Sequence, residues 1–126
     1  MSERLNISSG YSLEETYGYA RAVRVGNQVF VSGTTARGPD LDLDAYGQAT
    51  CAIGIIAETM QKAGANLRHA VRTVVYVTDM ADTDAVARAH GEAFGAVRPA
   101  STLVKVAGLT PAAARVEIEV TAIVHD

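Results

Sequence analysis

The sequence lacks the features on which several protein classes depend. It has 1 cysteine in 126 residues, so no disulfide can form within the chain, and a reducing compartment is the natural interpretation. No basic and then apolar leader opens the sequence, and no apolar run is long enough to span a bilayer. We therefore expect a cytoplasmic protein that does not enter a membrane.

Positive charge is also scarce. The chain has 11 Lys and Arg against 14 Asp and Glu, which gives a formal net charge of −3. Nucleic-acid binding depends on clustered Lys and Arg that neutralise phosphates. The composition thus argues against a nucleic-acid partner and favours a small-molecule ligand.

Motifs for bound cofactors and metals are missing as well. The sequence contains no phosphate loop, dinucleotide fingerprint or nucleophile elbow. His69 and His125 have no partner at metal-ligand spacing, and Cys51 lies among apolar neighbours. His90 falls beside the apolar face of a helical pattern, which is typical of a structural, hydrogen-bonded histidine. We expect no cofactor and no metal.

The patterns that are present predict alternating strands and helices. Gly26-Asn27, between two valine-rich runs, predicts a tight turn in a β-hairpin over 19–34. Apolar residues at helical spacing predict a helix over 45–63 and a second one that begins after Asp82 as N-cap. The other predicted segments are strands at 71–78, 102–107 and 115–124, a loop at 37–44, and little regular structure over 1–18.

This order, ββ-α-β-α-ββ, predicts a single α+β domain over 1–126, with two helices on one face of a mixed sheet. The segments 29–31 and 74–77 are apolar at every position, and hence on both faces of their strands. Two helices can cover one face alone, so the second face has to be buried elsewhere, most simply against copies of the chain. The pattern therefore favours an oligomer.

Several stretches resemble the RidA/YjgF family in their order and spacing over nearly the whole chain. They are Tyr19 with its hairpin, Val29-Phe30-Val31-Ser32-Gly33, 74–79, Arg98-Pro99-Ala100, 104–107 before Leu109, and 116–122. The resemblance implies a chorismate-mutase-like layer, a homotrimer whose sheets form a central barrel, and a ligand cleft at each subunit interface. For the best-known branch it implies hydrolysis of enamines and imines made from amino acids, with release of ammonia and a 2-keto acid.

The resemblance also implies site residues. The positions that line the family's ligand correspond to Tyr19, Ser32, Gly33 and Thr34. Tyr19 can equally be an aromatic residue at a strand start, and Gly33 can mark either close approach of a ligand or a β-bulge.

Glu117 is the candidate catalytic residue. Strand alternation directs Glu117 and Glu119 away from the helices, towards the space between subunits. A partly desolvated carboxylate can handle a proton or orient a water. The alternative for Glu117 is a salt bridge across the interface to Arg21 or Arg98, and for Glu119 we favour a structural role.

One position departs from the family pattern. In the best-known branch an arginine after the Pro-Ala pair clamps the substrate carboxylate, whereas this chain has Ser101. A serine cannot supply that two-pronged cation. The candidate replacements are Arg21, on the same strand face as Tyr19, and Arg98. If Arg21 takes this role, we expect it to pair with Glu117 in the empty site and to lower the pKa of that carboxyl.

The sequence leaves three functional hypotheses open. The first is a cofactor-independent hydrolase or deaminase that acts on a small enamine, imine or related carbonyl compound. The second is a non-catalytic trimer that binds a metabolite or stabilises other proteins. The third, RNA cleavage or inhibition of translation, is the one that the acidic composition disfavours.

Overall fold

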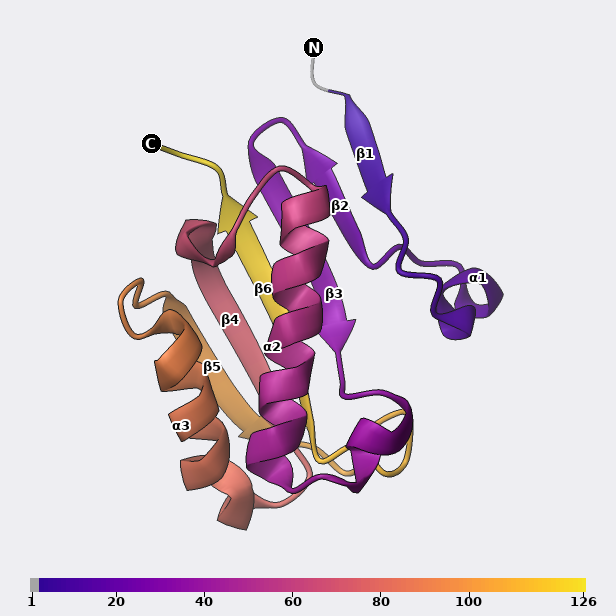
Figure 1. The fold of residues 1–126 in the computed structure, drawn as a ribbon, viewed down its shortest axis with the longest axis vertical. Helices are drawn as coiled ribbons and strands as arrows, with labels where there is room; N and C mark the ends of the chain where they lie inside the picture. Colours follow the sequence, from indigo (N-terminus) through magenta and orange to yellow (C-terminus); the bar gives the residue numbers. More distant parts are fainter. Residues whose placement is uncertain (1–2) are drawn as a thin grey trace.

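The computed structural model describes residues 3–126 as one six-stranded mixed sheet with helices against it (Figure 1). The strand order is β1-β2-β3-β6-β4-β5; β4 and β5 run parallel, and the other neighbours run antiparallel. The strands are β1 Arg4–Ile7, β2 Ala22–Val25, β3 Gln28–Thr34, β4 Ala70–Val77, β5 Ala100–Lys105 and β6 Val116–Ile123. The helices are α1 Ser12–Tyr17, α2 Ala45–Lys62 and α3 Thr83–Phe94, with 3-10 turns at Gly38–Asp42, Leu67–His69 and Met80–Asp82.

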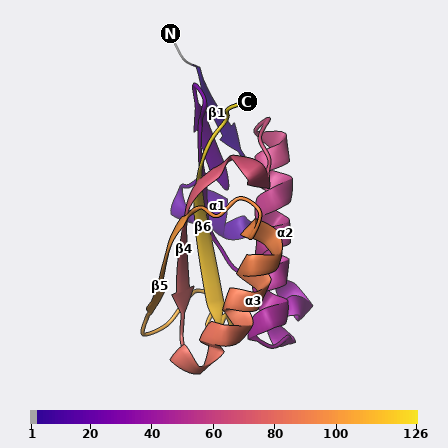
Figure 2. The ribbon, with the colours of Figure 1, turned by 90° about the vertical axis from the view of Figure 1, so that its left-hand side faces the viewer.

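The predicted class is confirmed, because α2 and α3 cover one face of the sheet (Figure 2). The turn at Gly26 has the expected positive φ, +59°. Asp44 caps α2 by accepting a hydrogen bond from the Gly47 amide, and Gly64 follows the helix with φ +77°. In the described part of the chain, no helix is both long and apolar enough to cross a membrane.

Two local predictions are wrong, and a third is right only in position. The first 18 residues contain β1 and α1; β1 is held by antiparallel pairing with β2, a long-range contact that local sequence does not encode. The predicted loop at 37–44 contains a 3-10 turn. Asp82 occupies the N-cap position of α3, as predicted, but its side chain makes no capping hydrogen bond, because its carboxylate accepts two hydrogen bonds from the Arg115 guanidinium, each at 3.2 Å.

The core lies between α2, α3 and the covered face of the sheet. It is built by the alternating strand positions that point towards the helices and by the inner face of α2: Val29, Val31, Ala49, Ile53, Ile56, Met60, Val75, Val77, Val116, Ile118, Val120 and Ala122. Burial of these side chains fixes the register of β6, and this sends its other side chains to the opposite face.

Neither α2 nor α3 covers the opposite face of the sheet (Figure 2). Phe30 is 45% exposed, Val25 41% and Val104 40%. The structure thus has the uncovered, apolar second face that the strand patterns predicted.

Buried Gln48 fastens α2 to the loop that leads into β6. Its side-chain amide donates to the carbonyl oxygens of Leu41, Leu43 and Ala113, and its oxygen accepts from the Arg115 amide at 2.8 Å. Four backbone groups, two in the segment before α2 and two in the loop before β6, therefore depend on one side chain.

We expect Gln48→Leu to destabilise the fold by about 2–3 kcal/mol, because it leaves buried backbone groups without partners. Urea unfolding followed by circular dichroism measures this loss. Gln61→Leu, at an exposed position of the same helix, is the matched control and should change stability far less. Equal stability of the two variants would contradict the role assigned to Gln48.

Candidate functional site

A cleft of about 810 Å³ lies where the free face of the sheet meets α1 and the loop before β6. Five of the eight residues that the sequence analysis assigned to a site line it: Tyr19, Arg21, Ser32, Gly33 and Glu117. The other lining residues are Tyr11, Leu13, Tyr17, Thr35, Tyr76, Gly108, Leu109, Thr110 and Glu119.

Glu117 is half-buried in this cleft, on the face of β6 that points away from the helices. Burial raises the pKa of its carboxyl above the ordinary glutamate value; the positive charge of Arg21 lowers it in part, and the negative charge of Glu119 raises it again. The predicted opposition between burial and Arg21 is therefore present, and burial prevails.

Gly33 makes room for this carboxyl group. A Cβ atom at position 33 would lie 2.9 Å from both Cδ and Oε2 of Glu117. The pairing register of β3 with β6 also shifts between Val31 and Thr34, so Gly33 lies in a strand irregularity. Of the two interpretations of this glycine, the structure favours the bulge, with the space above it taken by Glu117.

Tyr76 is a lining residue that the sequence analysis missed. Its register partner on β6 is Glu117, and its hydroxyl donates a hydrogen bond to Glu119. That hydrogen bond, burial and the two nearby carboxylates raise the pKa of Tyr76. Its alternation with Val75 and Val77 in β4 was the available signal, since it places the tyrosine on the free face.

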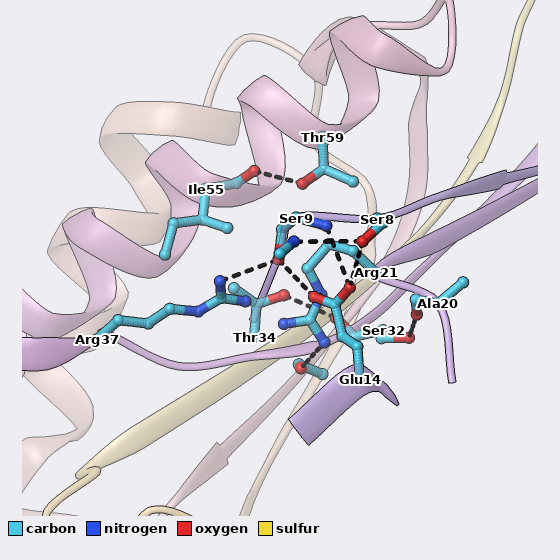
Figure 3. A network of polar contacts seen from close by, with 12 residues as sticks. Ser8, Ser9, Glu14, Ala20, Arg21, Ser32, Thr34, Arg37, Ile55 and Thr59 are labelled. Atoms are coloured by element: carbon cyan, nitrogen blue, oxygen red, sulfur yellow. Dashed lines mark hydrogen bonds and ion pairs between the residues drawn. The ribbon is translucent and has the colours of Figure 1, made fainter. Parts of the chain in front are cut away.

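Arg21 lies at the inner wall of the cleft and is 2% exposed. Its Nη2 donates to the Gly33 carbonyl oxygen at 2.9 Å, and its Cζ lies 5.3 Å from the centroid of the Tyr19 ring. Its ion-pair partner is Glu14, with 3.9 Å between Nε and Oε2 (Figure 3). The predicted pairing with Glu117 is therefore wrong.

Glu14 belongs to α1, which the sequence analysis did not foresee. It accepts hydrogen bonds from the Ser8 hydroxyl at 3.3 Å, from the Ser9 amide at 3.1 Å and from the Ser9 hydroxyl. Burial alone would raise the pKa of Glu14, but these hydrogen bonds and Arg21 hold it below its usual value. Arg37 extends the network, since it donates to Ser9 Oγ at 3.0 Å (Figure 3).

The remaining predicted residues do not line the cleft. Thr34 is fully buried and donates to the Ser32 carbonyl oxygen at 2.8 Å. Arg98 is exposed and has φ +58° beyond the end of α3. Ser101 accepts from Thr73 Oγ1 at 2.7 Å, and the same Thr73 oxygen lies 2.8 Å from His90 Nε2.

Ser101 therefore lies on the helix-covered side of the sheet, opposite Glu117. His90 has the hydrogen-bonded role expected of it, and burial lowers its pKa. Neither Arg98 nor Ser101 meets Glu117 within one chain. Among residues 3–126, no three His, Cys, Asp or Glu side chains gather as a metal site would require.

We expect Arg21→Met to cost about 3–5 kcal/mol of stability, because it leaves the buried Glu14 carboxylate without its cation. The double variant Glu14→Gln, Arg21→Met should recover part of that loss, since it removes both charges. Urea unfolding of the wild type, the two single variants and the double variant measures the free energies of unfolding for a double-mutant cycle. If the double variant lost as much stability as the two single variants together, the pairing of Arg21 with Glu14 would be contradicted.

Comparisons with known proteins agree with this architecture. The family model described as Endoribonuclease L-PSP matches residues 11–124. The crystal structure of Rv2704 from Mycobacterium tuberculosis, described as a member of the YjgF/YER057c/UK114 family, superposes with a TM-score of 0.91 at 41% identity and covers 97% of this chain and 100% of its own.

Two curated relatives extend the likeness. The protein SCO2049 of Streptomyces coelicolor is 40% identical over 119 residues, which are 92% of this chain and 89% of that protein. The mouse 2-iminobutanoate/2-iminopropanoate deaminase is 30% identical over 109 residues, 83% of this chain and 80% of its own. The fold, the family model and these relatives together show that the chain belongs to the Endoribonuclease L-PSP family, the RidA/YjgF family that its sequence motifs resemble.

Proposed function

We propose that this protein hydrolyses small imines or enamines without a cofactor, as one domain over 1–126 that works as a cytoplasmic homotrimer. The observation that carries the proposal is the half-buried Glu117, whose raised pKa suits it to both accepting and returning a proton. The mouse relative, named for deamination of 2-iminobutanoate and 2-iminopropanoate, supports the reaction class.

The chemistry needs one proton shuttle. A protonated imine, C=NH₂⁺, adds water at carbon while the Glu117 carboxylate takes a proton from that water. Glu117 then returns the proton to nitrogen, the C–N bond breaks, and the hydroxyl proton leaves with the amine, so that C=NH₂⁺ and H₂O give C=O and NH₄⁺. The hydrogen bond between Tyr76 and Glu119 fixes the wall beside the reacting group.

The trimer is part of the proposal because the free face needs a partner. Phe30, Val25 and Val104 are apolar and exposed there, and three copies of the chain would cover one another. Exposed Arg98 precedes β5 at the sheet edge and does not line the cleft of its own chain.

Ser101 supports a second candidate, a trimer that binds a metabolite without turning it over. Within one chain the cleft has no unpaired arginine among its described residues, so an ordinary amino-acid-derived imine would find no carboxylate clamp. RNA cleavage has less support, because Glu117 and Glu119 would face the phosphates.

We expect light scattering at micromolar concentration to give three times the chain mass of 13.2 kDa. Phe30→Lys should yield monomers, because a charge on the free face cannot be buried between sheets. Met80→Lys alters another exposed apolar residue, outside the sheet, and should leave the assembly unchanged. A monomeric wild-type protein would remove the interfacial site.

We expect Glu117→Gln to lower kcat/KM for imine hydrolysis by about 100-fold or more, with a smaller change in KM. The assay measures ammonia released from 2-iminopropanoate, freshly generated by an amino acid oxidase, and the opening of the cyclic imine 1-pyrroline to 4-aminobutanal. The wild-type rate should fall as pH drops through the raised pKa of Glu117, above the ordinary glutamate range, because protonation removes the base. Glu58→Gln, on an exposed part of α2, is the control; wild-type rates in Glu117→Gln would exclude the assigned role.

A further inference from the structure

The cleft collects tyrosines. Four of the chain's five line it: Tyr11, Tyr17, Tyr19 and Tyr76. The face of a tyrosine ring attracts a cation held within about 6 Å of its centroid. Two of these rings already bind arginines of the chain, with 5.3 Å from Arg21 Cζ to Tyr19 and 4.2 Å from Arg37 Cζ to Tyr11.

The other two rings have no such occupant in the described part of the chain. Tyr17 is 79% exposed and meets Tyr19 edge to face, with 5.7 Å between centroids. Tyr76 stands on the floor of the sheet, where its hydroxyl is engaged by Glu119. Both rings line the same cleft, and both are available to a cationic guest.

The charged groups of the cleft have the sign that a cation requires. Glu117 and Glu119 line it from alternate positions of β6, and Arg21 is its single lining cation among the described residues. Arg21 is ion-paired with Glu14 and acts only in part on Glu117, so the two β6 carboxylates carry more negative charge than this one guanidinium can balance. Arg72 acts on the Tyr76 hydroxyl, but it is exposed and does not line the cleft.

We propose that the cleft selects cations that carry no carboxylate: a protonated amine or an iminium ion, held against Tyr17 and Tyr76 with Glu117 and Glu119 as counter-charges. This deepens the proposed function by naming the ligand class, and it rests on that function for turnover but not for binding. A 2-imino acid would bring its carboxylate close to Glu117 and Glu119, and Arg21, which is already paired with Glu14, would offset only part of the repulsion.

The test compares three ligands that have nearly the same shape but differ in charge. Choline is the cation, 3,3-dimethylbutan-1-ol replaces its ammonium nitrogen by carbon, and 3,3-dimethylbutanoate is the anion. Calorimetric titration of the full-length protein should give choline about tenfold tighter binding than the alcohol, the size of a cation–π and ion-pair gain of about 1.4 kcal/mol. The carboxylate should bind most weakly.

Two variants assign the effect to residues. Glu119→Gln keeps an oxygen that can accept from the Tyr76 hydroxyl, so it removes charge without removing the hydrogen bond; it should reduce the preference for choline over the alcohol about fivefold. Tyr17→Leu replaces an exposed aromatic ring by an aliphatic side chain, and it should weaken the binding of choline more than the binding of the alcohol. Glu58→Gln makes the same charge change on exposed α2 and should leave the preference intact.

Each outcome decides the inference. Equal binding of choline and the alcohol, tighter binding of the carboxylate, no binding by any of the three, or equal effects of Glu119→Gln and Glu58→Gln would overturn it. Failure of the proposed hydrolase function gives a different result: neither 2-iminopropanoate nor 1-pyrroline is hydrolysed, while the order of the three affinities stands. The opposite result is faster hydrolysis of 2-iminopropanoate than of 1-pyrroline, with 3,3-dimethylbutanoate bound most tightly of the three ligands. It would support the proposed hydrolase function and overturn the proposed preference for cations.

Discussion

Strand β6 lies between β3 and β4. Its side chains alternate between the core under the helices and the free face of the sheet, where the cleft lies. Val116, Ile118, Val120 and Ala122 are buried under the helices, so their register cannot slip by one residue without exposing the whole set. The residues between them are thereby committed to the free face. Glu117 and Glu119 occupy the cleft because the apolar half of the same strand holds them there.

The electrostatics of the cleft follow from a second buried arrangement. Arg21 would be a strong anion ligand if it were free, but its charge is offset by Glu14 and its Nη2 is taken by the Gly33 carbonyl oxygen. The other charged side chains that line the cavity are the carboxylates Glu117 and Glu119, and its aromatic side chains are tyrosines. The mouse relative is named for the deamination of imino acids, whereas the ligand that we propose for this cleft is a cation without a carboxylate.

Much of the fold was predictable because its signals are local. The Gly26-Asn27 turn, the helical spacing in 45–63 and the alternation of 116–122 each act within a few residues, and each appears in the structure. The edge pairing of β1 with β2 and the contact of Asp82 with Arg115 join distant segments, and sequence analysis missed both. The site shows the same division: Glu117 was found by alternation, whereas Glu14 acts on the cleft from an unforeseen helix.

The sequence by itself determined the α+β class, the two-sided apolar sheet and the projection of Glu117 away from the helices, because periodicity and turn chemistry are written along the chain. Tertiary structure alone decided which charges meet. Arg21 was free, on sequence grounds, to face Glu117, and Ser101 to face the ligand. Folding instead paired Arg21 with Glu14 and put Ser101 beside Thr73, because partner choice for a buried polar group depends on segments brought together through space.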